Sequence, residues 1–222
     1  MVILELQIKE EIMIATVLSE EKTTPIPFVK SETKLNLLRA FAGESQARNR
    51  YTFAAERAQK EGYAIIANIF QCTADQEKEH AQIFYDTLKK NHCEEKFEIE
   101  ASYPVDGDGP LIDELMNAYH HEFSEFQKIY PDFAKKADEE GYPEIASLFR
   151  MIASIEQCHG ERFALFCKLL DQDQLFRDKE EVVWVCLNCG YRFIGTDAPT
   201  LCPVCKHNQG YYTRKALEPY DC

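Results

Sequence analysis

Hydrophobic residues recur at helical spacing in four long segments of the chain, residues 32–61, 63–89, 111–140 and 143–170. Gly62 and Gly141 directly follow the first and third segments, and glycine commonly ends helices. The short breaks there predict two antiparallel helical hairpins. Between the hairpins, residues 91–110 hold two prolines and two glycines, and a link of this length can cross a bundle from end to end. The pattern therefore predicts an all-α four-helix bundle with one long crossover, the connectivity of helix bundles that carry metal sites.

The two predicted hairpins resemble each other in sequence. The segments QKEGYAIIANIF and DEEGYPEIASLF align with an offset of 79 residues. The same offset pairs Glu77 with Glu156 and His80 with His159. Each hairpin thus carries Glu-x-x-His in its second helix, which indicates an internal duplication of a helix pair.

Carboxylates interrupt the apolar stripes of all four predicted helices. The two Glu-x-x-His pairs lie on the inward lines of the second and fourth segments, between residues such as Phe70 and Phe84. The first and third segments carry Glu44, Glu122 and Glu125 on the corresponding lines. We therefore expect every helix to aim a carboxylate into the middle of the bundle.

The alternative is that these glutamates turn outward to water. A single Glu-x-x-His on a helix binds metal about one time in ten or less, because short motifs often match by chance. Here the outward arrangement would have to hold on four helices, and burying the carboxylates without a cation would cost several kcal/mol for each charge. We predict two metal ions. Mixed carboxylate and imidazole ligands favour iron or manganese, and this ligand distribution over four helices is the general di-iron carboxylate arrangement.

A second predicted metal site lies near the C-terminus. Cys186, Cys189, Cys202 and Cys205 form two Cys-x-x-Cys pairs, and four thiolates suit a tetrahedral ion. The spacing alone allows a structural zinc ribbon or an iron centre. Gly190 after the second cysteine and Pro203 after the third resemble rubredoxin and favour Fe(Cys)4, although Lys206 stands where free rubredoxins usually carry glycine.

Charge and composition limit the partners and the location. The formal net charge is −13, which argues against nucleic acid and anionic membrane surfaces as partners. No apolar run approaches the length of a membrane span. Charged residues interrupt the apolar N-terminal stretch, so it does not read as a secretory signal, and the remaining cysteines are scattered as in a reducing compartment. These features predict a cytoplasmic protein.

Several motifs together resemble one family. The segments AFAGESQARNRY, TADQEKEH, EEGYPEIASLF and CLNCGY…CPVCKH are similar to rubrerythrin over about residues 32–215. The resemblance implies a ferritin-like bundle in residues 31–170, a linker in residues 171–183 and a rubredoxin-like domain in residues 184–222. Residues 1–30 form an N-terminal extension of unknown role. The resemblance also implies a ligand set for two iron ions: Glu44, Glu77, Glu122, Glu125, Glu156 and His159, with His80 a ligand in the reduced state.

The same resemblance implies a peroxidase. We expect the di-iron site to reduce hydrogen peroxide to water in defence against oxidative stress, with electrons relayed through the Fe(Cys)4 centre. The electrons would come from a separate NAD(P)H-dependent reductase or a rubredoxin, and the chain would form a homodimer. Iron storage, as in ferritins, and a zinc-ribbon adaptor are the alternatives.

The duplication is imperfect at one position, which predicts a helix irregularity. Glu44 and Glu122 differ by 78 residues rather than 79, so the third helix has one extra residue after its ligand. We expect a π-type bulge between Glu122 and Pro131, with the proline as a competing cause of a kink. Tyr51 and Tyr130 match family positions beside the irons, where they either hydrogen-bond ligand carboxylates or simply pack.

Overall fold

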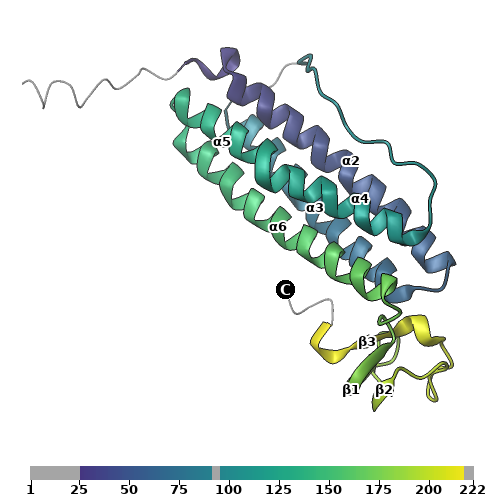
Figure 1. Cartoon of the computed structure of the whole chain (residues 1–222). Coiled ribbons are helices and arrows are strands. Elements are labelled where there is room, and N and C mark those ends of the chain that lie inside the picture. The colour runs from purple at the N-terminus through teal and green to yellow at the C-terminus, as the bar shows by residue number, and fades with distance from the viewer. Residues whose placement is uncertain (1–25, 92–95, 218–222) are drawn as a thin grey trace, which may run out of the picture.

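The computed structural model describes residues 26–91 and 96–217, and it contains a helical bundle with a small sheet-containing domain at one end (Figure 1). The predicted extension of residues 1–30 lies mostly outside the described residues. The long helices are α2 (Glu32–Lys60), α3 (Ala64–Lys90), α4 (Leu111–Ser124), α5 (Tyr130–Glu139) and α6 (Pro143–Asp171). A five-residue π-helical turn, η2 (Glu125–Ile129), joins α4 to α5, so that α4, η2 and α5 together form the predicted third helix of the bundle.

Local sequence signals explain where the helices begin and end. The Ser31 side chain accepts a hydrogen bond from the Lys34 amide and so caps the start of α2. Gly62 and Gly141 both have a φ of 86° in the turns after α2 and α5, a conformation that favours glycine. Pro143 occupies the first turn of α6, where its missing N–H costs nothing. The two predicted hairpins are therefore confirmed.

The π-helical turn confirms the predicted irregularity. It lies between Glu122 and Pro131, where the third helix has its extra residue. A π-helical turn takes in one more residue than an α-helical turn and restores the helix phase on either side. Consequently Tyr130 and Leu115, on opposite sides of η2, both remain buried in the bundle.

The crossover between the hairpins runs along the outside of the bundle (Figure 1). Its described part, residues 96–110, has no regular secondary structure. Tyr103 donates a hydrogen bond of 2.9 Å from its hydroxyl to the Arg39 carbonyl of α2, and Asp106 forms an ion pair of 3.3 Å with Arg50. These contacts hold the crossover against α2.

Helix α2 packs along α3, and α4 and α5 pack along α6. Among the described residues, the apolar core of the bundle divides into two clusters. One surrounds Phe70 and Phe163, and the other surrounds Phe84 and Phe149. Full burial of each such side chain contributes about 1.5–3 kcal/mol. The polar centre of the bundle lies between these two apolar clusters, which shield it from water.

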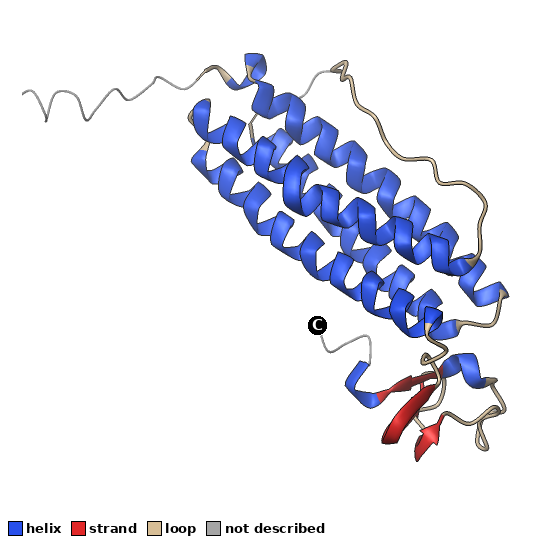
Figure 2. Ribbon diagram, viewed as in Figure 1, coloured by secondary structure: helices blue, strands red, loops and turns tan. Residues whose placement is uncertain are grey.

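The C-terminal domain is built on an antiparallel sheet (Figure 2). In the described residues its strands are ordered β2-β1-β3, with β1 (Arg177–Cys186), β2 (Arg192–Asp197) and β3 (Tyr212–Arg214). Short 3-10 turns accompany the helices and strands: η1 (Phe28–Lys30), η3 (Gln209–Tyr211) and η4 (Lys215–Leu217). Strand β1 begins within residues 171–183, the segment that we predicted to be a linker. The start of the strand pairs with the end of β2, where Arg177 lies opposite Asp197, and Arg214 of β3 forms a 2.8 Å ion pair with Asp178.

This domain packs against the turn between α2 and α3. The Tyr63 and Phe176 rings stack with centroids 6.3 Å apart, and the Gln59 side-chain amide donates a 2.9 Å hydrogen bond to the Tyr211 hydroxyl. Gly210 approaches the turn so closely that a Cβ atom would lie 1.7 Å from the Gly62 carbonyl oxygen. No helix in the described ranges is both long and apolar enough to cross a membrane.

Candidate metal centres

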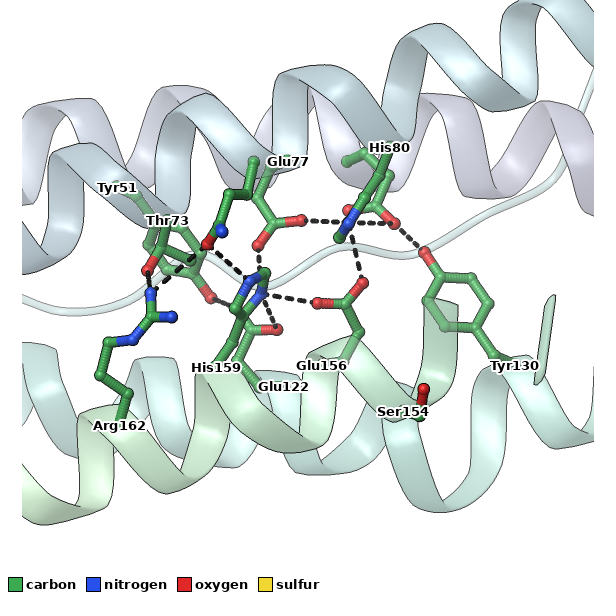
Figure 3. Close-up of polar contacts among 12 residues, drawn as sticks. Tyr51, Thr73, Glu77, His80, Glu122, Tyr130, Ser154, Glu156, His159 and Arg162 are labelled. Atoms are coloured by element: carbon green, nitrogen blue, oxygen red, sulfur yellow. Dashed lines mark hydrogen bonds and ion pairs between the residues drawn. The ribbon is translucent and has the colours of Figure 1, made fainter. Parts of the chain in front are cut away.

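The centre of the bundle brings together six of the seven predicted ligands (Figure 3). All six are at most 4% exposed: Glu44 from α2, Glu77 and His80 from α3, Glu122 from α4, and Glu156 and His159 from α6. The spacing of three residues in each Glu-x-x-His pair puts both side chains on one face of a helix. The duplicated helix pair therefore produces two facing sets of ligands.

These residues form two overlapping groups. Ligand atoms of Glu44, Glu77, His80 and Glu156 lie within 4.8 Å of one another, as do those of Glu77, Glu122, Glu156 and His159. Glu77 and Glu156 belong to both groups. Two carboxylates shared between two groups suit a pair of metal ions with bridging ligands.

Several buried polar atoms of the cluster have no hydrogen-bond partner of regular geometry among the described residues, and this shows whether the residues suit metal ions. Oxygen atoms of all four glutamates and Nδ1 of His159 are buried without a hydrogen bond of regular geometry. His159 Nδ1 nevertheless lies 2.7 Å from Glu156 and 2.9 Å from Glu77, so several lone pairs converge on one point. Buried carboxylates without donors are costly unless a cation neutralises them. The donor set of carboxylates and imidazoles therefore fits two ions such as iron.

The electrostatics of the cluster support the same conclusion. Burial, together with the charges of Glu77 and Glu156, raises the pKa of Glu44 well above its ordinary value. Burial and Glu77 raise the pKa of Glu122 to about 8. Burial alone would lower the pKa of His80, but its hydrogen bonds with Glu156 and Glu77 outweigh burial and raise it to about 9. Glu122 and His80 thus hold protons near neutral pH, which limits the net negative charge of the cluster.

Two tyrosines form hydrogen bonds with carboxylates of the cluster. Of the two predictions made for Tyr51 and Tyr130, hydrogen bonding to a carboxylate or simple packing, the first is confirmed. The Tyr51 hydroxyl donates to Glu122 Oε1, and the Tyr130 hydroxyl donates to Glu44 Oε1. Both tyrosines are buried, and each reaches across to a glutamate of the other hairpin. Each hydrogen bond uses Oε1 of a glutamate and limits the rotation of its carboxylate. The other oxygen, Oε2, remains available to bind a metal ion.

The sequence analysis missed Gln76. His159 Nε2 lies 3.0 Å from Gln76 Oε1, and Arg162 contacts the same oxygen at 3.4 Å. The amide oxygen accepts from the Nε2–H of His159, which leaves Nδ1 free to bind metal. Gln76 lies one residue before Glu77, off the apolar stripe, and nothing in the hydrophobic pattern marks it.

Glu125 lies apart from the six clustered ligands. It begins the π-helical turn and is half-buried, and burial together with Glu122 raises its pKa well above the ordinary value. It lines a cavity of about 450 Å³ beneath the crossover, together with Gly43, Tyr103 and Tyr130. His121 borders the same cavity and contacts Arg50 and Asp106, whereas His120 is exposed.

The four predicted cysteines also converge. Their Sγ atoms all lie within 4.8 Å of one another, with Cys186 and Cys205 at 3.6 Å and Cys189 and Cys202 at 3.7 Å. These four are free thiols in the structure. The hydrogen bond from the His207 amide lowers the pKa of Cys205 to about 5, which favours the thiolate that a metal requires.

The loops that hold these cysteines repeat the same geometry. The Gly190 amide donates to the Cys186 carbonyl at 2.8 Å, and the Lys206 amide donates to the Cys202 carbonyl at 3.0 Å. Gly190 has a φ of 73° and Lys206 a φ of 63°. A left-handed lysine costs about 1–2 kcal/mol, so the loop keeps the conformation that a glycine would adopt more easily.

Comparisons with known proteins agree with this geometry. The sequence model described as Rubrerythrin matches residues 36–167 and 113–185, and that of the rubrerythrin rubredoxin-like domain matches residues 184–213. The chain is 46% identical to rubrerythrin of Clostridium perfringens over 182 residues, which is 82% of this chain and 93% of that protein. It is 42% identical to rubrerythrin of Nitratidesulfovibrio vulgaris over 188 residues, or 82% of this chain and 93% of that one.

Solved structures show the same architecture. The mixed-valent state of nigerythrin superposes with a TM-score of 0.56 at 27% identity, covering 87% of this chain and 90% of that one. A bacterioferritin from Desulfovibrio desulfuricans superposes with a TM-score of 0.58 at 22% identity. The superposition covers 64% of this chain and 82% of the bacterioferritin chain, and it shows that the two share the bundle fold. The fold and the two metal centres define a ferritin-like di-iron protein with an appended rubredoxin-like domain. The chain belongs to the rubrerythrin family.

Proposed function

We propose that the chain is a non-haem di-iron peroxidase that reduces hydrogen peroxide to water and protects the cell against oxidative stress. One observation carries the proposal. Two groups of buried ligands share Glu77 and Glu156, and the same chain holds a four-cysteine centre. A paired site can deliver two electrons at once, and the four-cysteine centre can replace them one at a time.

The roles of the individual residues follow from their positions. We propose that Glu44, Glu77, His80, Glu122, Glu125, Glu156 and His159 hold two irons, and that Cys186, Cys189, Cys202 and Cys205 hold the third. When bound, the paired irons supply two electrons, which with two protons convert one peroxide into two water molecules. The protein holds the ligands, admits peroxide, excludes bulk water and supplies the protons.

Glu125 and the cavity beneath the crossover have a specific part in this proposal. The cavity of about 450 Å³ has ample room for peroxide and reaches Glu125 and Tyr130. Because Glu125 lies outside the six-residue cluster, its carboxyl group is able to turn toward or away from a metal. We propose that Glu125 is a ligand in the oxidised state and that His80 replaces it in the reduced state. The raised pKa of Glu125 suits it to carry a proton when it is not a ligand.

Electron supply and assembly complete the proposal. A separate NAD(P)H-dependent reductase or a rubredoxin would reduce the four-cysteine centre in the cytoplasm. A homodimer would bring the rubredoxin-like domain of one chain to the α3–α6 face of the other. On that face a cavity of about 730 Å³ is lined by Gln76 and His80. Removal of the rubredoxin-like domain would then block repeated turnover but not the reaction of the bundle with peroxide.

A single-turnover experiment tests this function. The protein is loaded with iron, reduced without oxygen and mixed with one equivalent of peroxide while the visible absorbance is followed. We expect about three irons per chain and rapid oxidation of the di-iron site by peroxide, faster than by dioxygen. Iron storage, the second candidate, predicts preference for dioxygen and uptake of many irons per chain. A single zinc per chain with no reaction would contradict both.

A further inference from the structure

The hydroxyl group of Tyr212 is buried beside the four-cysteine centre without a hydrogen bond. Tyr212 is 0% exposed, and its oxygen has no partner of regular geometry among the described residues. A buried hydroxyl without a partner costs about 1–3 kcal/mol. Phenylalanine would fill the same space without this cost, so the hydroxyl calls for an explanation.

The surroundings of Tyr212 contain metal ligands. Strand β3 pairs with β1 so that Tyr212 lies directly opposite Cys186, and the side chain packs in the domain core with Cys186, Cys202 and Trp184. Cys186 and Cys202 are the two buried cysteines of the four-cysteine group; burial raises the pKa of the Tyr212 hydroxyl, and its interaction with Cys202 raises it further. Trp184 uses its own N–H elsewhere, donating to the Gly195 carbonyl at 3.0 Å.

A neutral thiol and a metal-bound thiolate differ as acceptors. A thiol is a weak acceptor, so it leaves the Tyr212 hydroxyl poorly satisfied. A thiolate carries negative charge, and hydrogen bonds to charged acceptors are roughly twice as strong as neutral ones. The hydroxyl therefore gains its partner when Cys202 is deprotonated and bound to metal.

We propose that Tyr212 donates an O–H···S hydrogen bond to the Cys202 thiolate and raises the reduction potential of the Fe(Cys)4 centre. Reduction adds one electron, and part of the added charge lies on the sulfurs. A donor to sulfur therefore stabilises the ferrous state more than the ferric state, and hydrogen bonds to sulfur are an established determinant of such potentials. Tyr212 is a positioning and tuning residue, since it acts through Cys202. The inference requires iron in the four-cysteine site but not peroxidase activity.

The test is the midpoint potential of the iron-loaded full chain with Tyr212→Phe. This change removes only the hydroxyl, and we expect the potential to fall by about 59 mV, a tenfold decrease in the equilibrium constant for one-electron reduction. Tyr211→Phe is the matched control, because its hydroxyl contacts Gln59 of the bundle rather than a cysteine. The control should leave the potential unchanged. An unchanged potential in Tyr212→Phe, with iron bound and the visible spectrum intact, would overturn the inference.

A second measurement does not depend on iron redox chemistry. In the cobalt-substituted protein, loss of a hydrogen bond to the Cys202 thiolate should shift the sulfur-to-cobalt charge-transfer band to lower energy. A purely structural role for Tyr212 would change the unfolding temperature or the metal retention but would leave this band in place. That result would also contradict the proposal, whether or not the chain reduces peroxide.

Discussion

Tyr130 in α5 donates a hydrogen bond to Glu44 in α2, and so links the two helical hairpins across the metal site. Tyr51 makes the reciprocal link, donating from α2 to Glu122 in α4. The two tyrosines are 79 residues apart, whereas the two glutamates are 78 apart. The π-helical turn η2 lies between Glu122 and Tyr130 and absorbs this difference, which keeps both links in place.

Removal of either tyrosine hydroxyl should weaken the site. In Tyr130→Phe, Glu44 loses a donor, and we expect the metal-loaded protein to lose about 1 kcal/mol of unfolding free energy. Tyr51→Phe should behave similarly, because the two residues have equivalent roles. Chemical denaturation with spectroscopic monitoring of bound metal measures both effects. Equal stability of wild type and both variants would show that the tyrosines only pack.

Metal binding at the bundle should release protons. Glu122 has a pKa of about 8 and His80 a pKa of about 9, so both carry protons near neutral pH and must lose them to become ligands. Raising the pH removes these competing protons, and the affinity for cobalt should therefore increase between about pH 6 and about pH 9. Proton release in weakly buffered solution checks the sign. A Cys189→Ser variant is the control, because it should still release the protons that metal displaces at the bundle. A cobalt affinity that falls as the pH rises over this range would contradict the prediction.

The link between Glu140 and the start of α2 should stabilise the fold. The Glu140 carboxylate accepts hydrogen bonds from the amides of Glu32, at 3.0 Å, and Thr33, at 2.8 Å. Burial opposes ionisation, but the hydrogen bonds from Thr33 and Glu32 outweigh it and lower the pKa. A lowered pKa in the folded state stabilises the protein above the unfolded pKa, and this contribution is lost as the pH falls through the folded value.

Glu140→Ala tests this link. We expect a loss of about 1–2 kcal/mol at neutral pH, measured by denaturant unfolding, and a smaller difference from wild type in acid. Glu139→Ala is the control, since Glu139 is exposed and pairs only with Lys136 in the described structure. A difference between wild type and Glu140→Ala that grows as the pH falls would contradict the sign.

The proposed entry of electrons through the four-cysteine centre predicts a separation of two activities. Cys189→Ser should remove the Fe(Cys)4 centre while the bundle keeps its metal, because the two sites share no residue. The variant should lose NADH-linked turnover by at least about 100-fold, yet after chemical reduction it should still consume one equivalent of peroxide. Full NADH-linked turnover in Cys189→Ser would exclude the relay.

The close approach of Gly210 to Gly62 predicts that docking of the C-terminal domain is sensitive to one methyl group. A Cβ at position 210 would collide with the backbone oxygen of Gly62, so Gly210→Ala should destabilise the interdomain contact by about 1–3 kcal/mol. Hydrogen exchange around Gln59 and Tyr63 would measure the loosening. Gly107→Ala is the matched control, because a Cβ there meets nothing within 4 Å.

The sequence by itself determined the helices, the ligand types and one irregularity. Apolar periodicity, the repeated Glu-x-x-His and the two Cys-x-x-Cys pairs are local patterns, and local patterns determine which side chains share a face. The one-residue mismatch between Glu44 and Glu122 was also sufficient to predict η2, since an extra residue within a packed helix must be absorbed near that point.

Only the tertiary structure decided which groups meet across helices. It separated Glu125 from the six clustered candidate ligands, paired Gln76 with His159, and buried the Tyr212 hydroxyl in the core that also holds Cys202. It also brought Gly210 against Gly62 and Glu140 against Thr33. Each of these contacts joins residues on different elements, and its geometry depends on crossing angles and side-chain rotamers. No periodicity along one segment contains that information.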